Sequence, residues 1–289
     1  MAISTEHQRR TGKGNGYGIV LYALTLVAEF PGYLARAFVT IIPALLVFKI
    51  LFNDNGFLGN GLAVIVGFYP LVWSVCGLIY PLGTGWWWRN RSGGREPSQR
   101  ERRQVQDAFK PLAAKHPGLT LPNDWFVIDG QAIDAAVSGR TLKLSRGLLD
   151  SPWLECILAH ELGHLHTLDG HLTAALNRLV VWPDPLGPTP PGQRSGIVRL
   201  ILRGILWVAD GGAGLFFLKP FWGRYWRDRE YLADAYAAQL GAGEQLILAL
   251  ETEAMIYDRP VPFIWMTEHS HPPTELRIDR LRAARRSDG

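Results

Sequence analysis

The sequence predicts an α+β fold, in which a mainly helical domain with a small β-sheet is preceded by two transmembrane helices. Three observations predict it. Two long apolar zones lie near the start of the chain, an arginine-rich linker follows them, and the remainder mixes helical patterns with short strand patterns. The 289 residues are enough for one such domain plus membrane segments.

The composition also indicates contact with a membrane. Hydrophobic residues make up 47% of the chain and charged residues 19%, whereas about 25% charged residues is usual in soluble proteins. The 11 Trp residues support this interpretation, because indole rings favour the membrane interface. The net charge of +4 is too diffuse to indicate a nucleic-acid partner. Two cysteines without a Cys-x-x-Cys pair argue against a thiolate metal site or a disulfide framework.

Residues 17–88 form the predicted membrane region, after a polar tail at 1–16. A spanning helix needs about 20 mostly apolar residues, and the best stretches are about 35–52 and 62–84. Residues 17–34 predict either an interfacial helix or a further span, because charge and proline interrupt them. The alternative to the two spans is a buried hairpin in a soluble protein, but core helices seldom run this long without charge.

Positive charge flanks both outer ends of this pair of spans. The basic linker at 89–103 is rich in arginine and the tail carries Arg9 and Arg10, whereas the short link at 53–56 has no Lys or Arg. By the positive-inside rule, both ends lie in the cytoplasm. We therefore expect a multi-pass protein of the cell membrane, in contact with the lipid bilayer, whose following domain is cytoplasmic.

The domain itself is predicted over residues 104–289. Its first element is a helix over about 101–116. Short strands are predicted at 125–129 and 141–145, the second from alternating apolar and polar residues.

A long helix is predicted over residues 151–181, with Ser151 as its N-cap and Pro152 at its first helical position. Five prolines then predict a loop at 182–195. The apolar zone 196–222 contains charged residues, so a third membrane segment, a re-entrant hairpin and a buried helical pair all stay open.

His160 and His164 lie one turn apart on this helix. Side chains at i and i+4 share a helical face, close enough for both imidazoles to bind one zinc ion. Glu161 lies next to that face and can act as general base on a zinc-bound water, whose pKa zinc lowers to about 7. These three residues therefore predict the chemistry that peptide hydrolysis requires.

A catalytic zinc site needs a third protein ligand. One class of zinc peptidases takes it from a His six residues after the second one, but Gly170 stands there. His166 points away from the metal face, and His171 follows a glycine where the helix bends, so neither is favoured.

Glu230 is the better candidate for the third ligand. It shares a face with Asp234 on a helix predicted over Arg227 to Leu240 and ended by Gly241. One carboxylate can bind zinc, and the other can accept the outer N–H of a zinc-bound His. The alternative is a solvated, salt-bridged helical face.

His271 precedes two prolines, which hold it stiffly. It is a candidate donor to the oxyanion of a tetrahedral intermediate. Arg277 lies on the first turn of a helix predicted to begin near Thr274. The alternative for this pair is a loop His and a surface Arg.

Three motifs in this order resemble those of the HtpX-like membrane zinc metallopeptidases, which are relatives of the CAAX prenyl endopeptidase family. The resemblance covers roughly residues 104–285. It implies a zincin-type metallopeptidase domain with one Zn²⁺ per chain, Glu161 as general base, Asp234 orienting a ligand His, and His271 and Arg277 on the substrate side. The implied zinc ligands are His160, His164 and Glu230. The motifs are His160-Glu-Leu-Gly-His164, Glu230-Tyr-x-Ala-Asp234 and His271-Pro-Pro-Thr-x-x-Arg277-Ile.

In that family, a strand upstream of the metal helix carries an Asn-Ala pair and binds extended substrate by strand addition. The matching residues here are Asp134, Ala135, Ala136 and Val137, with Asp134 where the family has Asn. The resemblance thus implies a zinc-dependent endopeptidase that acts on membrane or membrane-proximal proteins. Two alternatives stay open: a non-catalytic membrane protein that uses the scaffold for binding or assembly, and another zinc-assisted hydrolysis.

Overall fold

Two compact units make up the chain, and the computed structural model describes parts of both. The described residues are 14–30, 72, 74–79, 84–179, 196–197, 212–257 and 271–288. The first unit comprises residues 1–19, 77–174 and 220–289, and the second comprises 20–76 and 175–219. The candidate site lies in the first unit.

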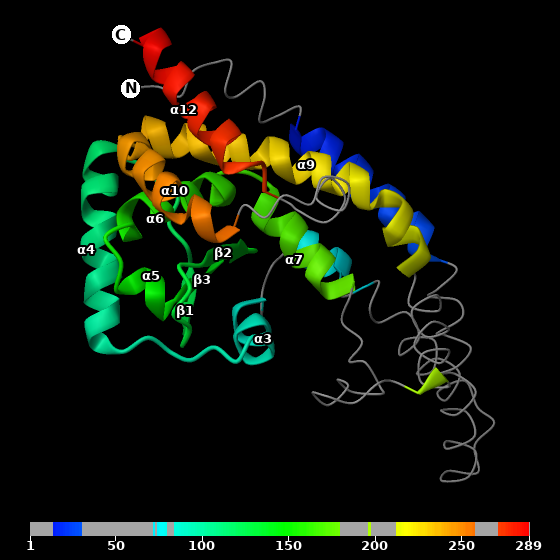
Figure 1. Cartoon of the computed structure of the whole chain (residues 1–289). Coiled ribbons are helices and arrows are strands. Elements are labelled where there is room, and N and C mark those ends of the chain that lie inside the picture. Colours follow the sequence, from blue (N-terminus) through cyan, green and yellow to red (C-terminus); the bar gives the residue numbers. More distant parts are fainter. Residues whose placement is uncertain are drawn as a thin grey trace, which may run out of the picture. The chain divides into compact units, whose positions relative to one another are not determined.

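A three-stranded mixed sheet is the β part of the first unit (Figure 1). Its central strand, β3 (Thr141–Ser145), pairs parallel with β1 (Asp124–Ile128) and antiparallel with β2 (Ala135–Ser138). The strands predicted at 125–129 and 141–145 are therefore confirmed. Strand β2 is the stretch that the family resemblance matched to a substrate strand.

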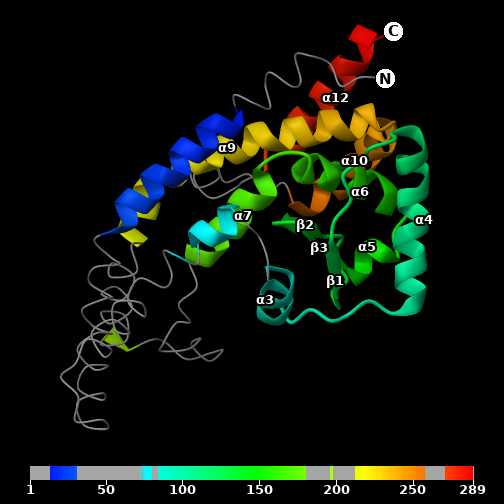
Figure 2. The same cartoon turned by 180° about the vertical axis from the view of Figure 1, so that it is seen from behind.

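Helices precede and follow the sheet along the chain. Helix α3 (Thr84–Arg91) packs against β1 and β3, and the short helix α5 (Arg146–Leu149) packs against β3 and α4. Helix α4 (Gln99–Lys115) confirms the helix predicted over 101–116. It stands beside the sheet in both views (Figures 1 and 2).

The predicted helix over 151–181 is wrong in its continuity. The structure has two helices, α6 (Leu154–Leu165) and α7 (Asp169–Leu179). The break follows from local competition for backbone partners, because the Thr167 hydroxyl donates to the His164 carbonyl and accepts from the Asp169 N–H.

The predicted start of this helix is also corrected. Helix α6 begins at Leu154, with Trp153 as an N-cap that makes no side-chain hydrogen bond. Ser151 instead stabilises the turn before the helix, where its hydroxyl accepts from the Trp153 N–H at 3.2 Å. Serine hydroxyls favour such turns as readily as caps, which is why the sequence did not separate the two.

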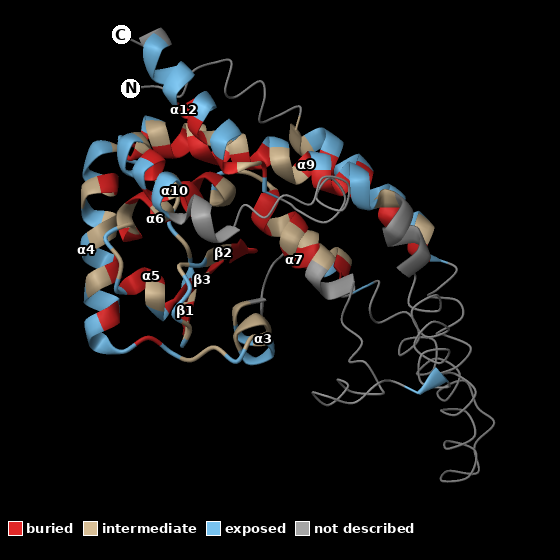
Figure 3. Cartoon of the chain, viewed as in Figure 1, coloured by how far each residue is buried: buried red, intermediate tan, exposed pale blue. Residues whose placement is uncertain are grey.

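Helix α6 is buried because it packs into two hydrophobic clusters at once (Figure 3). Leu154 and Leu158 enter the sheet cluster, which also contains buried residues of α4, α5 and the three strands. Cys156, Ala159 and Leu162 enter the helical cluster, which is formed with residues of α4, α9, α10 and α12. The remaining face of α6 carries His160 and His164.

Three further helices are α9 (Gly212–Gln239), α10 (Gly243–Tyr257) and α12 (Thr274–Asp288), and all but the first eight residues of α9 belong to the first unit. Helix α9 begins well before Arg227, where the sequence predicted its start, but ends as predicted. Gly241 follows that end with φ of +79°, a conformation that glycine adopts readily. Helix α12 begins at Thr274, as predicted, and packs against α10.

The membrane region is described only in part. Residues 14–30 and 74–79 are helical. The predicted span at 35–52 and the loop at 182–195 lie outside the described residues, as do most of 62–84 and of 196–211. Among the residues that are described, no helix combines the length and the apolar character that crossing a membrane requires.

Candidate metal centre

Two helices that touch through a glycine bring the ligand candidates together. A Cβ atom on Gly163 of α6 would stand 2.7 Å from the Ala233 Cα of α9, so only glycine lets the two backbones come this close. Gly163 is therefore a packing residue, one of the two roles that its poor helix propensity suggested. The contact places His160 and His164 opposite Glu230, which lies one turn before Ala233 on α9.

The three candidate ligands converge on one point. One ligand atom from each of His160, His164 and Glu230 lies within 4.8 Å of the others. Both Nε2 atoms face the carboxylate, at 3.5 Å from Oε2 for His160 and 3.3 Å from Oε1 for His164. The structure thus brings together the set that the sequence assigned to zinc, although the third member lies far along the chain.

The outer nitrogens of both histidines meet carboxylates. His160 Nδ1 lies 2.8 Å from Asp234 Oδ1, and His164 Nδ1 lies 3.1 Å from Asp169 Oδ2. A carboxylate there selects the tautomer that donates from Nδ1 and leaves Nε2 free as a ligand. Asp234 thus contacts the outer nitrogen of His160, and its role in orienting that ligand stays a prediction.

Asp169 is a functional residue that the sequence analysis missed. It was counted inside a continuous helix, whereas it is the first residue of α7. Gly170 fixes this start, because its carbonyl accepts from the Gly139 N–H at 2.6 Å and a Cβ on Gly170 would collide with the Gly139 carbonyl. The adjacent Asp-Gly pair after a Thr was the signal that could have revealed the break.

Arg277 is bound to the ligand-orienting carboxylate. Its Nη2 and Nε donate to Asp234 Oδ1 and Oδ2 at 2.6 and 2.8 Å, and its Nη1 lies 3.6 Å from Glu230 Oε2. Burial alone would raise the pKa of Asp234, but the Arg277 charge and hydrogen bonds lower it to about 2. Asp234 is therefore a permanent anion beside His160.

The remaining catalytic candidates lie near the same point. Glu161 is buried on α6, directly after His160, and the negative charge of Glu161 contributes to the raised pKa of Arg277. His271 is exposed, with its Nδ1 2.9 Å from Glu230 Oε2. His271 is thus the exposed residue of this group, whereas Glu161, Glu230 and Asp234 are buried.

The donor set fits a divalent cation. Glu230 Oε2 is buried and has no hydrogen-bond partner among the described residues, although His271 Nδ1 lies 2.9 Å from it. A bound cation would satisfy this oxygen. Burial opposes the charge of Glu230, yet the charge of His271 and the ring nitrogens of the two other histidines beside the carboxylate hold its pKa well below the usual value. Burial likewise opposes protonation of His160 and His164, but their carboxylate partners raise both pKa values. The geometry therefore favours positive charge at its centre, and two imidazoles with one carboxylate are ligands that zinc accepts.

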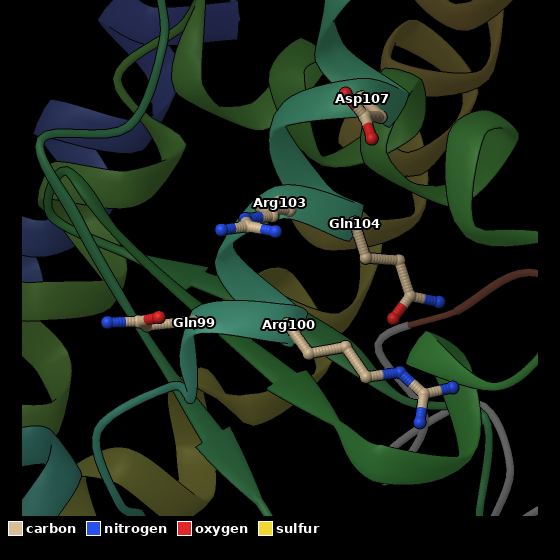
Figure 4. Close-up of a pocket in the computed structure, with 5 residues that line it drawn as sticks. All are labelled: Gln99, Arg100, Arg103, Gln104 and Asp107. Atoms are coloured by element: carbon tan, nitrogen blue, oxygen red, sulfur yellow. The ribbon is translucent and has the colours of Figure 1, made fainter.

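Two other histidines lie away from this group, as expected. His166 stacks on Tyr236 with ring centroids 5.0 Å apart, and His171 Nδ1 lies 3.0 Å from the Leu78 carbonyl. A shallow hollow along α4 also contributes none of the ligands (Figure 4); its lining residues are Gln99, Arg100, Arg103, Gln104 and Asp107.

The four candidate substrate-binding residues lie on and beside β2. Ala135, Ala136 and Val137 belong to the strand, and Asp134 precedes it. The Asp134 carboxylate forms a 2.7 Å ion pair with Lys143 Nζ. Strand β2 packs against α6 and pairs with β3 on one side, while its other side is paired with no described strand.

Comparisons with known proteins found a family model, relatives and a solved structure that are similar to this chain. The profile of peptidase family M48 matches residues 99–285. The chain is similar to "Protease HtpX homolog" of Tropheryma whipplei (strain Twist), with 26% identity over 234 residues, 66% of this chain and 76% of that protein. It is also similar to "Protease HtpX" of Haemophilus ducreyi, with 26% identity over 272 residues, 82% of this chain and 92% of that protein. Among solved structures, S. mikatae Ste24p gives a TM-score of 0.47 at 18% identity, over 91% of this chain and 66% of that chain.

Proposed function

Because this chain belongs to peptidase family M48, we propose that it is a membrane-anchored zinc endopeptidase that hydrolyses peptide bonds of membrane or membrane-proximal proteins. The resemblance to the HtpX-like relatives of the CAAX peptidases is confirmed. The observation that carries the proposal is the convergence of His160, His164 and Glu230, with both histidines oriented through Nδ1.

Zinc, when bound to these three residues, supplies Lewis-acid polarisation of the scissile carbonyl and a water of lowered pKa. Glu161 would accept the proton of the attacking water and deliver it to the leaving amine. Its position directly after His160 puts its carboxylate at the edge of the ligand face. His271, which is exposed beside Glu230, would donate to the developing oxyanion.

For Arg277, which the resemblance puts on the substrate side, the contacts support a positioning role. Its guanidinium is nearly buried, with 11% of the side chain exposed, and binds Asp234 through two hydrogen bonds. In the proposed enzyme, Arg277 holds the anion that orients His160, and it contributes positive charge behind Glu230.

An extended substrate would bind along the side of β2 that pairs with no described strand, by the strand addition that sheet edges support. The packing of β2 against α6 supports this, because it places the strand beside the helix that carries the zinc ligands. The Asp134 carboxylate is held by Lys143, so it would shape the end of the strand rather than bind the peptide.

The test combines metal analysis with proteolysis of an unfolded protein by the full-length chain in detergent. Glu161→Gln is expected to retain about one zinc per chain and to lose activity by roughly 10²–10⁴-fold. Glu230→Ala is expected to lose both zinc and activity. Glu155→Gln, the same change on the first turn of α6, is the matched control.

Full activity of Glu161→Gln would rule out the proposed mechanism. A wild-type chain without stoichiometric zinc would instead favour the non-catalytic binding or assembly protein. Retention of zinc together with hydrolysis of a small ester, but of no peptide, would point to another zinc-assisted hydrolysis.

A further inference from the structure

Asp169 is the hub of a buried polar cluster behind the second zinc ligand. One carboxylate oxygen, Oδ2, lies against His164 Nδ1. The other, Oδ1, accepts from Arg229 Nε at 2.6 Å and from the Tyr225 hydroxyl at 3.0 Å. The orientation of the carboxylate, and through it that of the His164 ring, is therefore set by two residues of α9.

Arg229 is the most deeply enclosed cation of the described residues. Only 1% of its surface is exposed, although its neighbour in sequence, Asp228, is exposed. A buried charge is costly unless it is paired and hydrogen-bonded. The Asp169 carboxylate, itself buried, is this partner, because Arg229 Nε lies 2.6 Å from its Oδ1.

The N-terminal helical segment covers the far side of Arg229. Asn15 Oδ1 accepts from Arg229 Nη2 at 3.2 Å. A Cβ on Gly14 would stand 2.5 Å from Arg229 Nη1, and a Cβ on Gly18 would stand 2.7 Å from Leu172 Cδ1 and 2.8 Å from the Tyr225 hydroxyl. Residues 14 and 18 share a helical face, so two glycines let this turn lie directly on the cluster. Gly16, between them, faces open space.

We propose that residues 14–18 help to form the metal centre. They hold Arg229 against Asp169, and Asp169 in turn positions His164 to bind zinc. The inference rests on the proposed zinc function. Asn15, Tyr225, Arg229 and Asp169 are positioning residues, since none of them meets the metal. The glycines of this turn, which the sequence analysis left without a role, are the residues that permit the contact.

The arrangement mirrors the one behind the other histidine. His160 is oriented by Asp234, and Asp234 is held by Arg277 of α12. His164 is oriented by Asp169, and Asp169 is held by Arg229 under the N-terminal turn. Each ligand histidine thus has one carboxylate and one arginine behind it, and Arg229 is the more deeply buried of the two arginines.

The first test is an alanine series on the three glycines of the full-length chain. The zinc dissociation constant is measured by chelator competition, with the thermal unfolding of the metal-free protein in parallel. Gly14→Ala and Gly18→Ala are expected to weaken zinc binding by about 10-fold, the lower end of what loss of an outer partner causes. Gly16→Ala, whose new methyl group meets nothing, is expected to bind zinc as the wild type does.

A second set of variants keeps the test valid if alanine at Gly14 or Gly18 prevents folding. Asn15→Ala removes one hydrogen bond without adding volume. Arg229→Met is expected to weaken zinc binding by roughly 10–100-fold, and Arg229→Lys to restore part of it. Arg224→Met, an exposed position on the same helix, is the control. The visible absorption of Co²⁺ bound in place of zinc reports the ligand geometry, and it is expected to change in Asn15→Ala and Arg229→Met but not in Arg224→Met.

The outcomes separate the inference from the proposed function. A wild-type chain that binds no zinc overturns the proposed function and the inference with it. A wild type that binds zinc, together with Asn15 and Arg229 variants of unchanged affinity and Co²⁺ spectrum, overturns the inference alone. Equal weakening in Gly16→Ala or Arg224→Met also overturns it, because the effect would then be general loosening.

Discussion

Gly163 shows how one missing side chain sets the spacing of the centre. It stands between the two ligand histidines in the sequence, at the point where α6 approaches Ala233 of α9. Alanine is the better helix former by about 1 kcal/mol. Its methyl group would however meet the Ala233 backbone at 2.7 Å, and backbone cannot move aside as a flexible side chain can.

We therefore expect Gly163→Ala to lower the free energy of unfolding by roughly 1–3 kcal/mol, the usual cost of overpacking. Zinc binding is expected to weaken as well, because Glu230 moves with α9. Thermal unfolding and chelator titration measure the two effects. Gly16→Ala is the control, since it adds the same methyl group in a helix where nothing meets it. A Gly163→Ala protein with the same free energy of unfolding as the wild type would contradict this, because α6 and α9 could then move slightly apart without destabilising the fold.

At the scale of single residues, the spacing of side chains along one helix was enough to predict the candidate site residues on that helix. His160, Glu161 and His164 follow from helical periodicity alone, and Glu230 follows from the need for a third ligand. Asp169 and Arg229 were missed for a physical reason. Their importance arises from a contact between residues about 60 positions apart, and nothing in the sequence near either residue distinguishes a buried charge from an exposed one.

The start of α4 is an element whose stability depends on one buried carboxylate. Glu101 accepts the Ser98 N–H at 2.7 Å, and its own N–H donates to the Ser98 hydroxyl, which together form a capping box. Two donors of Arg95 also bind it, at 2.7 and 2.9 Å. These hydrogen bonds, first of all that from Arg95, outweigh burial and lower the pKa of Glu101 to about 2.

The lowered pKa predicts an acid-sensitive contribution to stability. A carboxyl group whose pKa is lower in the folded state than the ordinary 4.5 stabilises the fold above that value. The contribution is then lost as the pH falls from about 4.5 through about 2. We expect thermal stability in this window to fall more steeply in the wild type than in Glu101→Gln, and Glu101→Gln to be less stable by roughly 1–3 kcal/mol at pH 7.

The comparison needs a control, because protonation of other groups also acts in this window. Glu275→Gln removes an exposed carboxylate from the first turn of α12. Its pH profile is expected to follow that of the wild type. Parallel profiles for the wild type and Glu101→Gln would contradict the assigned role of the Glu101 carboxylate.

Among the elements, those with a strong local signal were predicted. Helix α4, strands β1 and β3, the end of α9 and the start of α12 follow from periodicity and turn residues. The break between α6 and α7 did not, because a Thr hydroxyl that competes for backbone partners is a weak signal inside an apolar helix. The long helix α9 continues through Pro220, where the sequence favours an end.

At the scale of the whole molecule, the family match and the candidate metal site both indicate a metallopeptidase, whereas the membrane arrangement is predicted from the sequence alone. The family match begins at residue 99, near the end of the basic linker. The first two apolar zones lie before that residue. Since residues 14–18 also contact Arg229, the same N-terminal part of the chain is proposed to serve both the anchor and the metal centre.

The positive-inside rule predicts the side of the membrane on which this centre works. A reporter fused after Arg103 is expected to show a cytoplasmic location, because arginines flank the second apolar zone at that end. A fusion after Asn55, in the link without Lys or Arg, is the control and is expected to report the opposite side. An external location for the Arg103 fusion would place the peptidase domain, and its substrates, on the far face. The same location for both fusions would show that the apolar zone between them does not cross the membrane. The two locations together therefore distinguish an anchor of two spans from another arrangement.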